Sequence, residues 1–298
     1  MKRPVTRRNA IAMTAAGALA GTVGPARAYP LTTTFGEDFL TPWSPASGVP
    51  RNLTPGKTPI RLSCVAYNLA YEEGKSIADK VKKVREMGYT AAESDDSWRK
   101  APDSAIRELK DALKAHDVLF YGLHICVNTI HPDPTERQAI LKRVTGLVET
   151  ADRLGLPFVV SHVGSRDISP TRPHRDNWTK ETWDMSVRSM KQILRDTSGS
   201  KVSLAIEAIN PTHLNNPRAH VRLREDVGDP RIKVTLDPTN MLNTSVYYRA
   251  TELINECFAL LGEDILYAHA KDVLWKPEML PAFSWVVPGE GTMDYEVY

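Results

Sequence analysis

Val202-Ser-Leu-Ala-Ile-Glu207 is an apolar run that ends on a carboxylate, and two later stretches repeat the arrangement. Ile232-Lys-Val-Thr-Leu-Asp237 ends on an aspartate, and Ile265-Leu-Tyr-Ala-His269 ends on a histidine. The three polar residues are 30 and 32 residues apart. That interval is about the length of a strand, a helix and two short loops, which is how parallel strands are built. Parallel strands end at one face of the fold, so the sequence predicts that the three side chains converge there.

The chain before and between these stretches shows the same alternation of strand and helix. Apolar residues recur at helical spacing in five segments, which are residues 76–87, 104–116, 135–154, 179–195 and 246–261. Four further strands are predicted at residues 61–67, 89–92, 118–123 and 158–161, with strand-end residues Tyr67, Glu93, His124 and His162. Seven such steps, with a polar residue at nearly every strand end, favour an α/β fold of the (β/α)8 TIM-barrel class. A doubly wound sheet is the main alternative, but Tyr67-Asn-Leu-Ala-Tyr-Glu-Glu-Gly74 contains no glycine-rich phosphate turn.

The predicted barrel domain, residues 59–298, lacks an eighth strand. After the seventh strand the chain continues to Pro288-Gly-Glu-Gly-Thr-Met-Asp-Tyr-Glu-Val-Tyr298 and stops. An unclosed barrel leaves two parallel edge strands unpaired, which is costly. We therefore expect a barrel truncated before strand eight, either because the sequence is a fragment or because strand pairing is completed from elsewhere.

Charge and cysteine content exclude several classes of protein. The 298 residues are 42% hydrophobic and 25% charged, with a formal net charge of +2. Residues 1–28 hold five of the 38 basic residues and none of the 36 acidic ones, so the remainder has a net charge of about −3. We therefore expect no nucleic-acid partner and no stable membrane association. Cys64, Cys126 and Cys257 are too few and too widely spaced for a disulfide framework or a zinc knuckle.

Residues 1–28 have the pattern of a twin-arginine-type signal peptide. Thr6-Arg7-Arg8 is followed by a mildly apolar stretch and by the cleavage pattern Ala26-Arg27-Ala28. The apolar stretch is too short to span a membrane. This pattern predicts an exported protein, periplasmic or extracellular, and a general-secretion signal or a disordered basic tail is the alternative. Residues 29–58 are rich in Pro, Thr, Ser and Gly and are predicted to form an extended arm.

Glu207, Asp237 and His269 form the strongest chemical constellation in the sequence. Two carboxylates and one imidazole suit a divalent ion such as Mn²⁺, Mg²⁺, Co²⁺ or Zn²⁺. Open positions on such an ion can chelate a carbonyl and a neighbouring hydroxyl, as sugars and hydroxy-ketones offer. Polar residues also occur at solvated strand ends without any ligand, but three at successive strand ends favour a metal site.

Four short motifs give this constellation a family resemblance. They are Ile206-Glu207-Ala-Ile-Asn210, Leu236-Asp237-Pro-Thr-Asn240, His269-Ala-Lys271-Asp272 and Pro288-Gly-Glu290-Gly-Thr-Met-Asp294. In this order and spacing, residues 60–298 resemble the xylose isomerase-like TIM-barrel superfamily. That superfamily contains sugar phosphate isomerases and epimerases, inosose dehydratases and endonuclease IV.

The chain also departs from the patterns of this superfamily. Asn240 stands where many relatives carry a histidine, and Val287-Pro288 replaces the residues before Gly-Glu-Gly that the zinc nuclease needs, so endonuclease activity is not expected. Trp275 stands where ketohexose-type epimerases carry an arginine. The eighth-strand glutamate of the epimerases, a metal ligand and half of their acid–base pair, is missing, and Glu290 is a stand-in by composition only.

The resemblance implies a metal-dependent isomerase or epimerase that transfers a proton beside a metal-bound carbonyl of a sugar or keto-sugar. A carbon–oxygen lyase of the inosose dehydratase type and a non-catalytic sugar-binding barrel are the alternatives. Barrels of this group often pair, so a homodimer is expected. Metal binding is predicted for Glu207, Asp237 and His269, catalysis for Glu207, His124 and Lys271, and binding of a small carbohydrate for Glu93, His162, Asn210 and Trp98. His131, His174, His213 and His220 fall in predicted loops or an exposed helix and receive no role.

Overall fold

The computed structural model describes residues 61–64, 69–276 and 278–298. The predicted signal peptide, the predicted arm and the first strand end at Tyr67 lie outside the described residues. Within the described residues, no helix combines the length and the apolar character needed to cross a bilayer.

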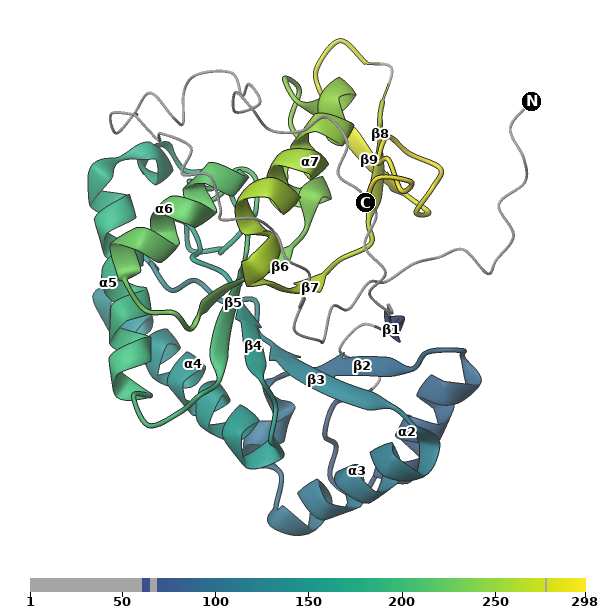
Figure 1. The fold of residues 1–298 in the computed structure, drawn as a ribbon. Helices are drawn as coiled ribbons and strands as arrows, with labels where there is room; N and C mark the ends of the chain where they lie inside the picture. Colours follow the sequence, from purple (N-terminus) through teal and green to yellow (C-terminus); the bar gives the residue numbers. More distant parts are fainter. Residues whose placement is uncertain (1–60, 65–68, 277) are drawn as a thin grey trace, which may run out of the picture.

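A curled parallel sheet forms the centre of the molecule (Figure 1). Its strands follow one another in sequence order, which is the order of a TIM barrel. They are β1 (Ser63–Cys64), β2 (Ala91–Ser94), β3 (Leu119–His124), β4 (Phe158–Ser161), β5 (Ser203–Glu207), β6 (Ile232–Leu236) and β7 (Ile265–Ala268). The predicted TIM-barrel fold is confirmed, with seven parallel strands among the described residues.

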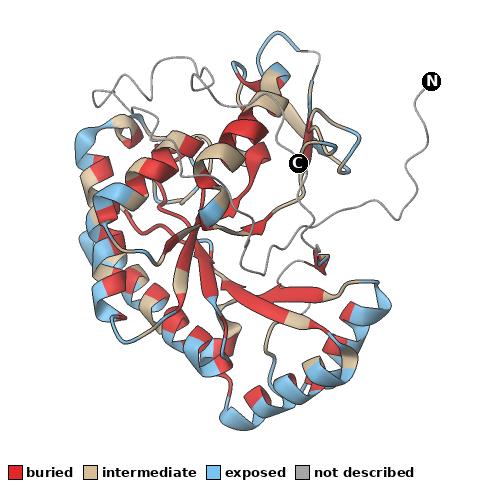
Figure 2. Cartoon of the chain, viewed as in Figure 1, coloured by how far each residue is buried: buried red, intermediate tan, exposed pale blue. Residues whose placement is uncertain are grey.

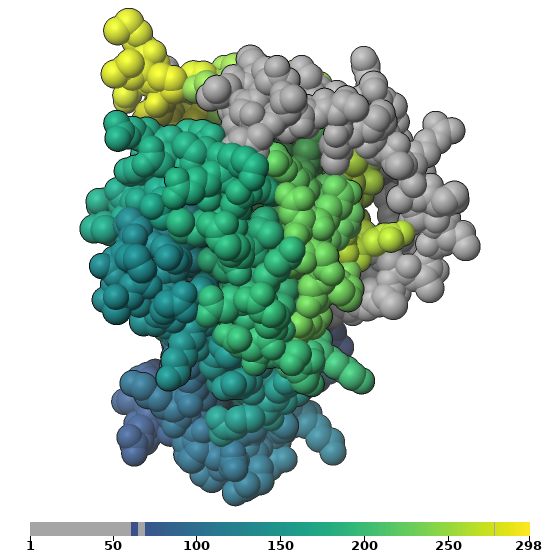
Figure 3. All heavy atoms as spheres, turned by 90° about the vertical axis from the view of Figure 1, so that its left-hand side faces the viewer, coloured from purple at the N-terminus to yellow at the C-terminus, as the bar shows by residue number. Residues whose placement is uncertain are grey.

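Helices connect the strands and follow one another around the outside of the sheet (Figure 1). They are α2 (Ile77–Glu86), α3 (Asp103–His116), α4 (Pro134–Leu154), α5 (Lys180–Asp196), α6 (Pro217–Val227) and α7 (Ala250–Leu261). Their buried side chains face the sheet and their exposed ones face solvent (Figure 2). The side chains of α4, α5 and α6 form much of the outer surface seen in Figure 3.

Local sequence explains where the helices begin and end. Asp133 caps α4 by accepting hydrogen bonds from two backbone N–H groups. Pro134 occupies the first turn, where backbone N–H groups have no partner within the helix, so the missing N–H of proline costs no hydrogen bond. Thr179 caps α5 by accepting a hydrogen bond from the Thr182 N–H. Gly155 ends α4 with a φ of 77°, a left-handed conformation that glycine adopts without strain.

Apolar side chains fill both faces of the sheet. The larger cluster lies between the sheet and helices α2 to α6. A smaller cluster fills the inside of the curled sheet with side chains from β2, β3, β4, β5 and β7, namely Ala91, Tyr121, Phe158, Val160, Ala205 and Tyr267. The interior is therefore packed, and polar side chains are left to gather at the strand ends.

The segment after β7 forms a hairpin that the sequence did not predict. β8 (Asp272–Trp275) pairs with β9 (Phe283–Val286) in an antiparallel sheet separate from the parallel one, so β8 is not an eighth barrel strand. The hairpin lies beside α7 (Figure 1). The helix predicted for residues 246–261 is also modified, because its first turn is the 3-10 helix η6 (Tyr247–Arg249).

Candidate metal centre

Glu207, Asp237 and His269 meet at the carboxyl ends of three neighbouring strands. Glu207 is the last residue of β5, Asp237 directly follows β6, and His269 directly follows β7. His269 Nδ1 lies 3.2 Å from Glu207 Oε1 and 3.3 Å from Asp237 Oδ2. The parallel register produces this contact, because the His269 N–H donates to the Leu236 carbonyl oxygen at 2.9 Å and continues the ladder by one residue.

The backbone also fixes which oxygen of Asp237 faces the cluster. Asp237 caps the 3-10 helix η5 (Pro238–Met241), where Oδ1 accepts the Asn240 N–H at 3.1 Å. Oδ2 is left facing His269 and Lys271, whose Nζ lies 2.5 Å away. The Asp237 side chain is fully buried, so a cation must balance its charge.

The donor set and its spacing fit a divalent ion. Ligand atoms about 2.1 Å from one ion, at angles of roughly 90 to 109°, lie about 3.0 to 3.4 Å from each other. The observed separations of 3.2 and 3.3 Å fall in this range. Two carboxylate oxygens and one imidazole nitrogen are donors that Mn²⁺, Mg²⁺, Co²⁺ and Zn²⁺ accept. Glu207, Asp237 and His269 could therefore hold such an ion.

Charges and hydrogen bonds among the side chains of the cluster shift their pKa values. Burial opposes the charge of Glu207, but the charge and hydrogen bond of His269, with His162 and Lys271, outweigh burial and hold the Glu207 pKa well below its usual value. Burial likewise opposes charge on His269, yet Glu207 and Asp237 raise the His269 pKa to about 10. The same carboxylates raise the pKa of Lys271 against its burial.

Two further histidines approach Glu207 from the opposite side. His162 Nε2 and His124 Nε2 lie 3.7 and 4.0 Å from Glu207 Oε2, and 3.4 Å from each other. Burial lowers the pKa of His162 to about 4, so its imidazole is neutral at physiological pH. The two oxygens of Glu207 thus differ, because Oε1 faces His269 and Lys271 while Oε2 faces two imidazoles.

Glu93 extends the cluster to β2. Its side chain is 1% exposed, and neither carboxylate oxygen has a hydrogen-bond partner among the described residues. His124 Nδ1 lies 3.8 Å from Glu93 Oε1. A buried carboxylate without hydrogen bonds is costly, and Glu93 with His124 and His269 forms a second group that could hold a metal ion.

Comparisons with known proteins agree with this architecture. A search of curated sequences finds no significant match. The family described as xylose isomerase-like TIM barrel matches residues 81–298. The chain belongs to this family.

Solved structures with a similar fold carry different activities in their names. The probable 3-DHS dehydratase AsbF from Bacillus anthracis has a TM-score of 0.59 at 14% identity, over 79% of this chain and 86% of that one. D-psicose 3-epimerase from Clostridium cellulolyticum H10 has a TM-score of 0.52 at 21% identity, over 66% and 70%. A Mycobacterium smegmatis barrel protein in complex with magnesium has a TM-score of 0.54 at 14% identity, over 73% and 74%. At these identities the likeness establishes the fold alone.

Two asparagines of this xylose isomerase-like barrel make hydrogen bonds at or near the metal centre. Asn240, which the sequence marked only as a departure from relatives, donates from Nδ2 to Glu207 Oε1 at 2.7 Å. Asn210, predicted to bind substrate, donates from Nδ2 to the Leu242 carbonyl oxygen at 3.0 Å, and its N–H donates to the Asn240 carbonyl oxygen. Asn210 therefore fixes the loop that carries Asn240.

Trp98 does not reach the metal centre. It lies on the 3-10 helix η3 (Asp96–Lys100), is 1% exposed, and belongs to the core between the sheet and the helices. Its Nε1 donates to the Leu69 carbonyl oxygen at 2.8 Å. A buried indole in this position packs the loop after β2, and its contact with substrate stays a prediction.

Asp272, from the third motif of the family pattern, holds the backbone of the fourth motif in place. Asp272 is buried, and its carboxylate accepts hydrogen bonds from the N–H groups of Val273, Gly289, Gly291 and Met293 at 2.8 to 3.0 Å. A Cβ on Gly291 would lie 2.1 Å from Asp272 Oδ1, so only glycine permits this approach. Glu290 is exposed to solvent on this loop.

His213 lies in a loop, as predicted, and is buried there; His220 is buried too, so the prediction of an exposed helix is wrong. They are 1% and 3% exposed, and burial lowers their pKa values to about 3 and about 4. His220 lies on the side of α6 that faces the core, which the mixed sequence of this helix did not reveal.

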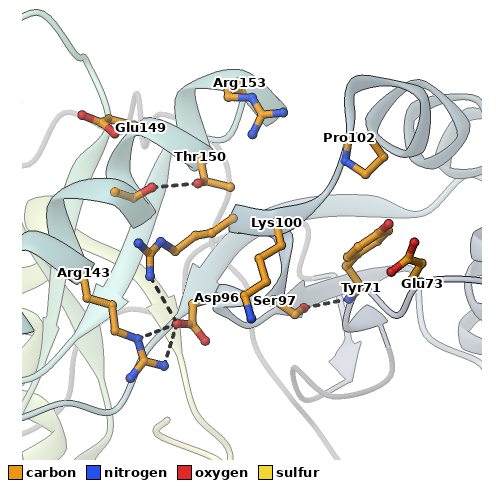
Figure 4. Close-up of a pocket in the computed structure, with 12 residues that line it drawn as sticks. Tyr71, Glu73, Asp96, Ser97, Lys100, Pro102, Arg143, Glu149, Thr150 and Arg153 are labelled. Carbon is orange, nitrogen blue, oxygen red and sulfur yellow. Dashed lines mark hydrogen bonds and ion pairs between the residues drawn. The ribbon is translucent and has the colours of Figure 1, made fainter.

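A large open hollow lies elsewhere, between η3 and α4 (Figure 4). Its volume is about 1030 Å³, and its lining shares no residue with the metal centre. Arg143 ion-pairs with Asp96 across it at 2.6 Å, and Arg99 approaches the same carboxylate. Among the described residues, none of the side-chain groups that could hold a metal ion lies in this hollow.

Proposed function

We propose that this xylose isomerase-like barrel is a metal-dependent isomerase or epimerase of a sugar or keto-sugar. The observation that carries the proposal is the position of Glu207. One of its oxygens faces His269 and Lys271, and the other faces His124 and His162. The same carboxylate can therefore help to hold an ion and present a free oxygen to a substrate.

A divalent ion bound by Glu207, Asp237 and His269 would act as a Lewis acid toward a substrate carbonyl. The protein then has to move a proton at the neighbouring carbon. Glu207 Oε2 is placed to take that proton, because it faces His124 and His162 at 4.0 and 3.7 Å and no described residue donates a hydrogen bond to it. His124, on the same side, can bind a substrate hydroxyl or return the proton.

Lys271 supports a second candidate, a carbon–oxygen lyase. Its ammonium lies 2.5 Å from Asp237 Oδ2 and 3.5 Å from Glu207 Oε1, and these carboxylates hold it charged. A fixed ammonium beside the proton-accepting carboxylate can protonate a departing β-hydroxyl, and loss of water would then follow proton removal. The two proposals share the metal centre and differ in the product.

Metal analysis with a matched pair of variants tests the shared part of both proposals. Wild-type protein, Glu207→Gln and Glu290→Gln are purified, exposed to Mn²⁺, Mg²⁺, Co²⁺ and Zn²⁺ in turn, and freed of unbound ion. We expect wild type and Glu290→Gln to retain an ion and Glu207→Gln to lose it, because Glu290 is exposed outside the cluster. Wild type without any bound divalent ion would refute both enzyme proposals.

Incubation of ketoses in D₂O separates the remaining alternatives. Deuterium that enters the carbon beside the carbonyl, with an isomeric sugar as product, supports the isomerase or epimerase. Loss of water to an unsaturated or deoxy product supports the lyase. A bound ion and bound sugar without either reaction would leave a sugar-binding barrel and contradict the catalytic proposal.

A further inference from the structure

Strand alternation sorts the side chains of the β8–β9 hairpin into two faces. Val273 pairs with Trp285, and Trp275 pairs with Phe283, so these four side chains share one face. Tyr247 packs against this face, with its ring centroid 5.5 Å from those of Trp275 and Phe283. The face that carries Trp285 is therefore the one turned toward the body of the protein.

Trp285 differs from its neighbours on this face because it remains uncovered. It is 65% exposed, whereas Val273, directly opposite, is 5% exposed. Its ring centroid lies 5.9 Å from Lys271 Nζ, within the range of a cation–π contact. Since Lys271 contacts both Asp237 and Glu207, a single side chain separates the indole from the carboxylates of the metal centre.

The backbone holds Trp285 in this position. The Asp272 carboxylate accepts four backbone N–H groups from β8 and from the loop that follows β9, which ties both strands of the hairpin together. Tyr247 adds a second anchor, because its hydroxyl accepts the Trp275 N–H at 2.9 Å. An exposed tryptophan on a hairpin anchored in this way loses little freedom when a ligand covers it.

We propose that Trp285 is a substrate-binding residue, the platform on which the apolar face of the carbohydrate stacks at the entrance to the metal centre. This inference rests on the proposed function and names the binding surface of the same site. A sugar ring or chain has C–H groups on one face that pack on an aromatic ring, while its oxygens remain free for polar contacts. On Trp285, those oxygens would face Lys271 and the metal ligands.

Equilibrium binding tests the platform. Metal-loaded wild type, Trp285→Ala, Trp285→Gln, Trp285→Phe and Leu274→Ala are titrated calorimetrically with D-fructose, D-tagatose and D-psicose. We expect Trp285→Ala and Trp285→Gln to weaken binding about tenfold, Trp285→Phe to restore most of it, and Leu274→Ala, on the other hairpin face, to bind as wild type does. Because Trp285 is mostly exposed, its variants fold, and unchanged circular dichroism and metal content verify this.

The outcomes separate this inference from the proposed function. If wild type binds a sugar and both Trp285→Ala and Trp285→Gln bind it equally well, the platform is refuted and the proposed function is unaffected. A loss of turnover with unchanged sugar affinity would also overturn it, because Trp285 would then act by orienting Lys271. Metal-loaded wild type that binds none of the three sugars would refute the ketohexose platform, while the metal and D₂O experiments would still decide the proposed function.

Discussion

His213 should make the protein less stable in acid, by an amount that its surroundings determine. It lies between β5 and α6 and is 1% exposed. Ser186 Oγ donates to the Thr182 carbonyl oxygen, so it accepts from His213 Nε2–H at 2.8 Å. Nδ1 has no hydrogen-bond partner among the described residues. Protonation would therefore place a buried charge on an imidazole with no acceptor for its new N–H.

The size of the effect follows from the two pKa values. Burial lowers the His213 pKa from 6.5 to about 3 in the folded protein. Between these values the unfolded chain binds a proton that the folded protein excludes, so the free energy of unfolding falls as pH drops below 6.5, by about 1.4 kcal/mol per pH unit. From pH 8 to pH 5, His213 alone should cost about 2 kcal/mol. Above pH 7 the effect is absent.

Urea denaturation of wild type and His213→Gln at pH 8 and pH 5, both metal-free, isolates this contribution. Gln retains a donor for Ser186 but does not titrate, and the other buried histidines contribute equally to both proteins. We expect the pH-dependent loss of unfolding free energy to be about 2 kcal/mol smaller in His213→Gln. Equal losses in the two proteins would refute the reasoning and show that His213 accepts a proton in the folded state.

Two further predictions concern the hairpin and the metal centre. Gly291→Ala should destabilise the protein by about 3 kcal/mol or more, because its Cβ would lie 2.1 Å from Asp272 Oδ1, whereas Gly199→Ala, with no atom within 4 Å, should change stability by less than about 1 kcal/mol. Thermal denaturation compares the two, and equal melting temperatures would contradict the Asp272 contact. Lys271→Met should retain bound metal, because the substitution removes a positive charge that lies 2.5 Å from Asp237 Oδ2 and leaves the three metal ligands in place. It should lower turnover roughly 10² to 10⁴-fold, because the ammonium acid is lost. Unchanged turnover would exclude Lys271 as an acid.

The fold could be predicted because strand and helix periodicities were strong and separate. β4, β6 and β7 have the predicted bounds, and β5 is shifted by one residue. The β8–β9 hairpin was missed because two four-residue strands carry too few alternations to stand out from a loop. The metal ligands, catalytic residues and substrate contacts remain predictions about roles, although the structure brings most of them together.

The sequence by itself determined that Glu207, Asp237 and His269 share one end of the sheet. Parallel strands at regular spacing leave no other arrangement for their last residues. Tertiary structure decided which other side chains join them. The sequence does not distinguish the role of Trp98 from that of Trp285. The 3-10 helix η3 places Trp98 in the core, whereas the contacts of Asp272 hold Trp285 at the surface beside Lys271. Contacts between residues far apart in the chain decide which of the two side chains is buried and which is exposed.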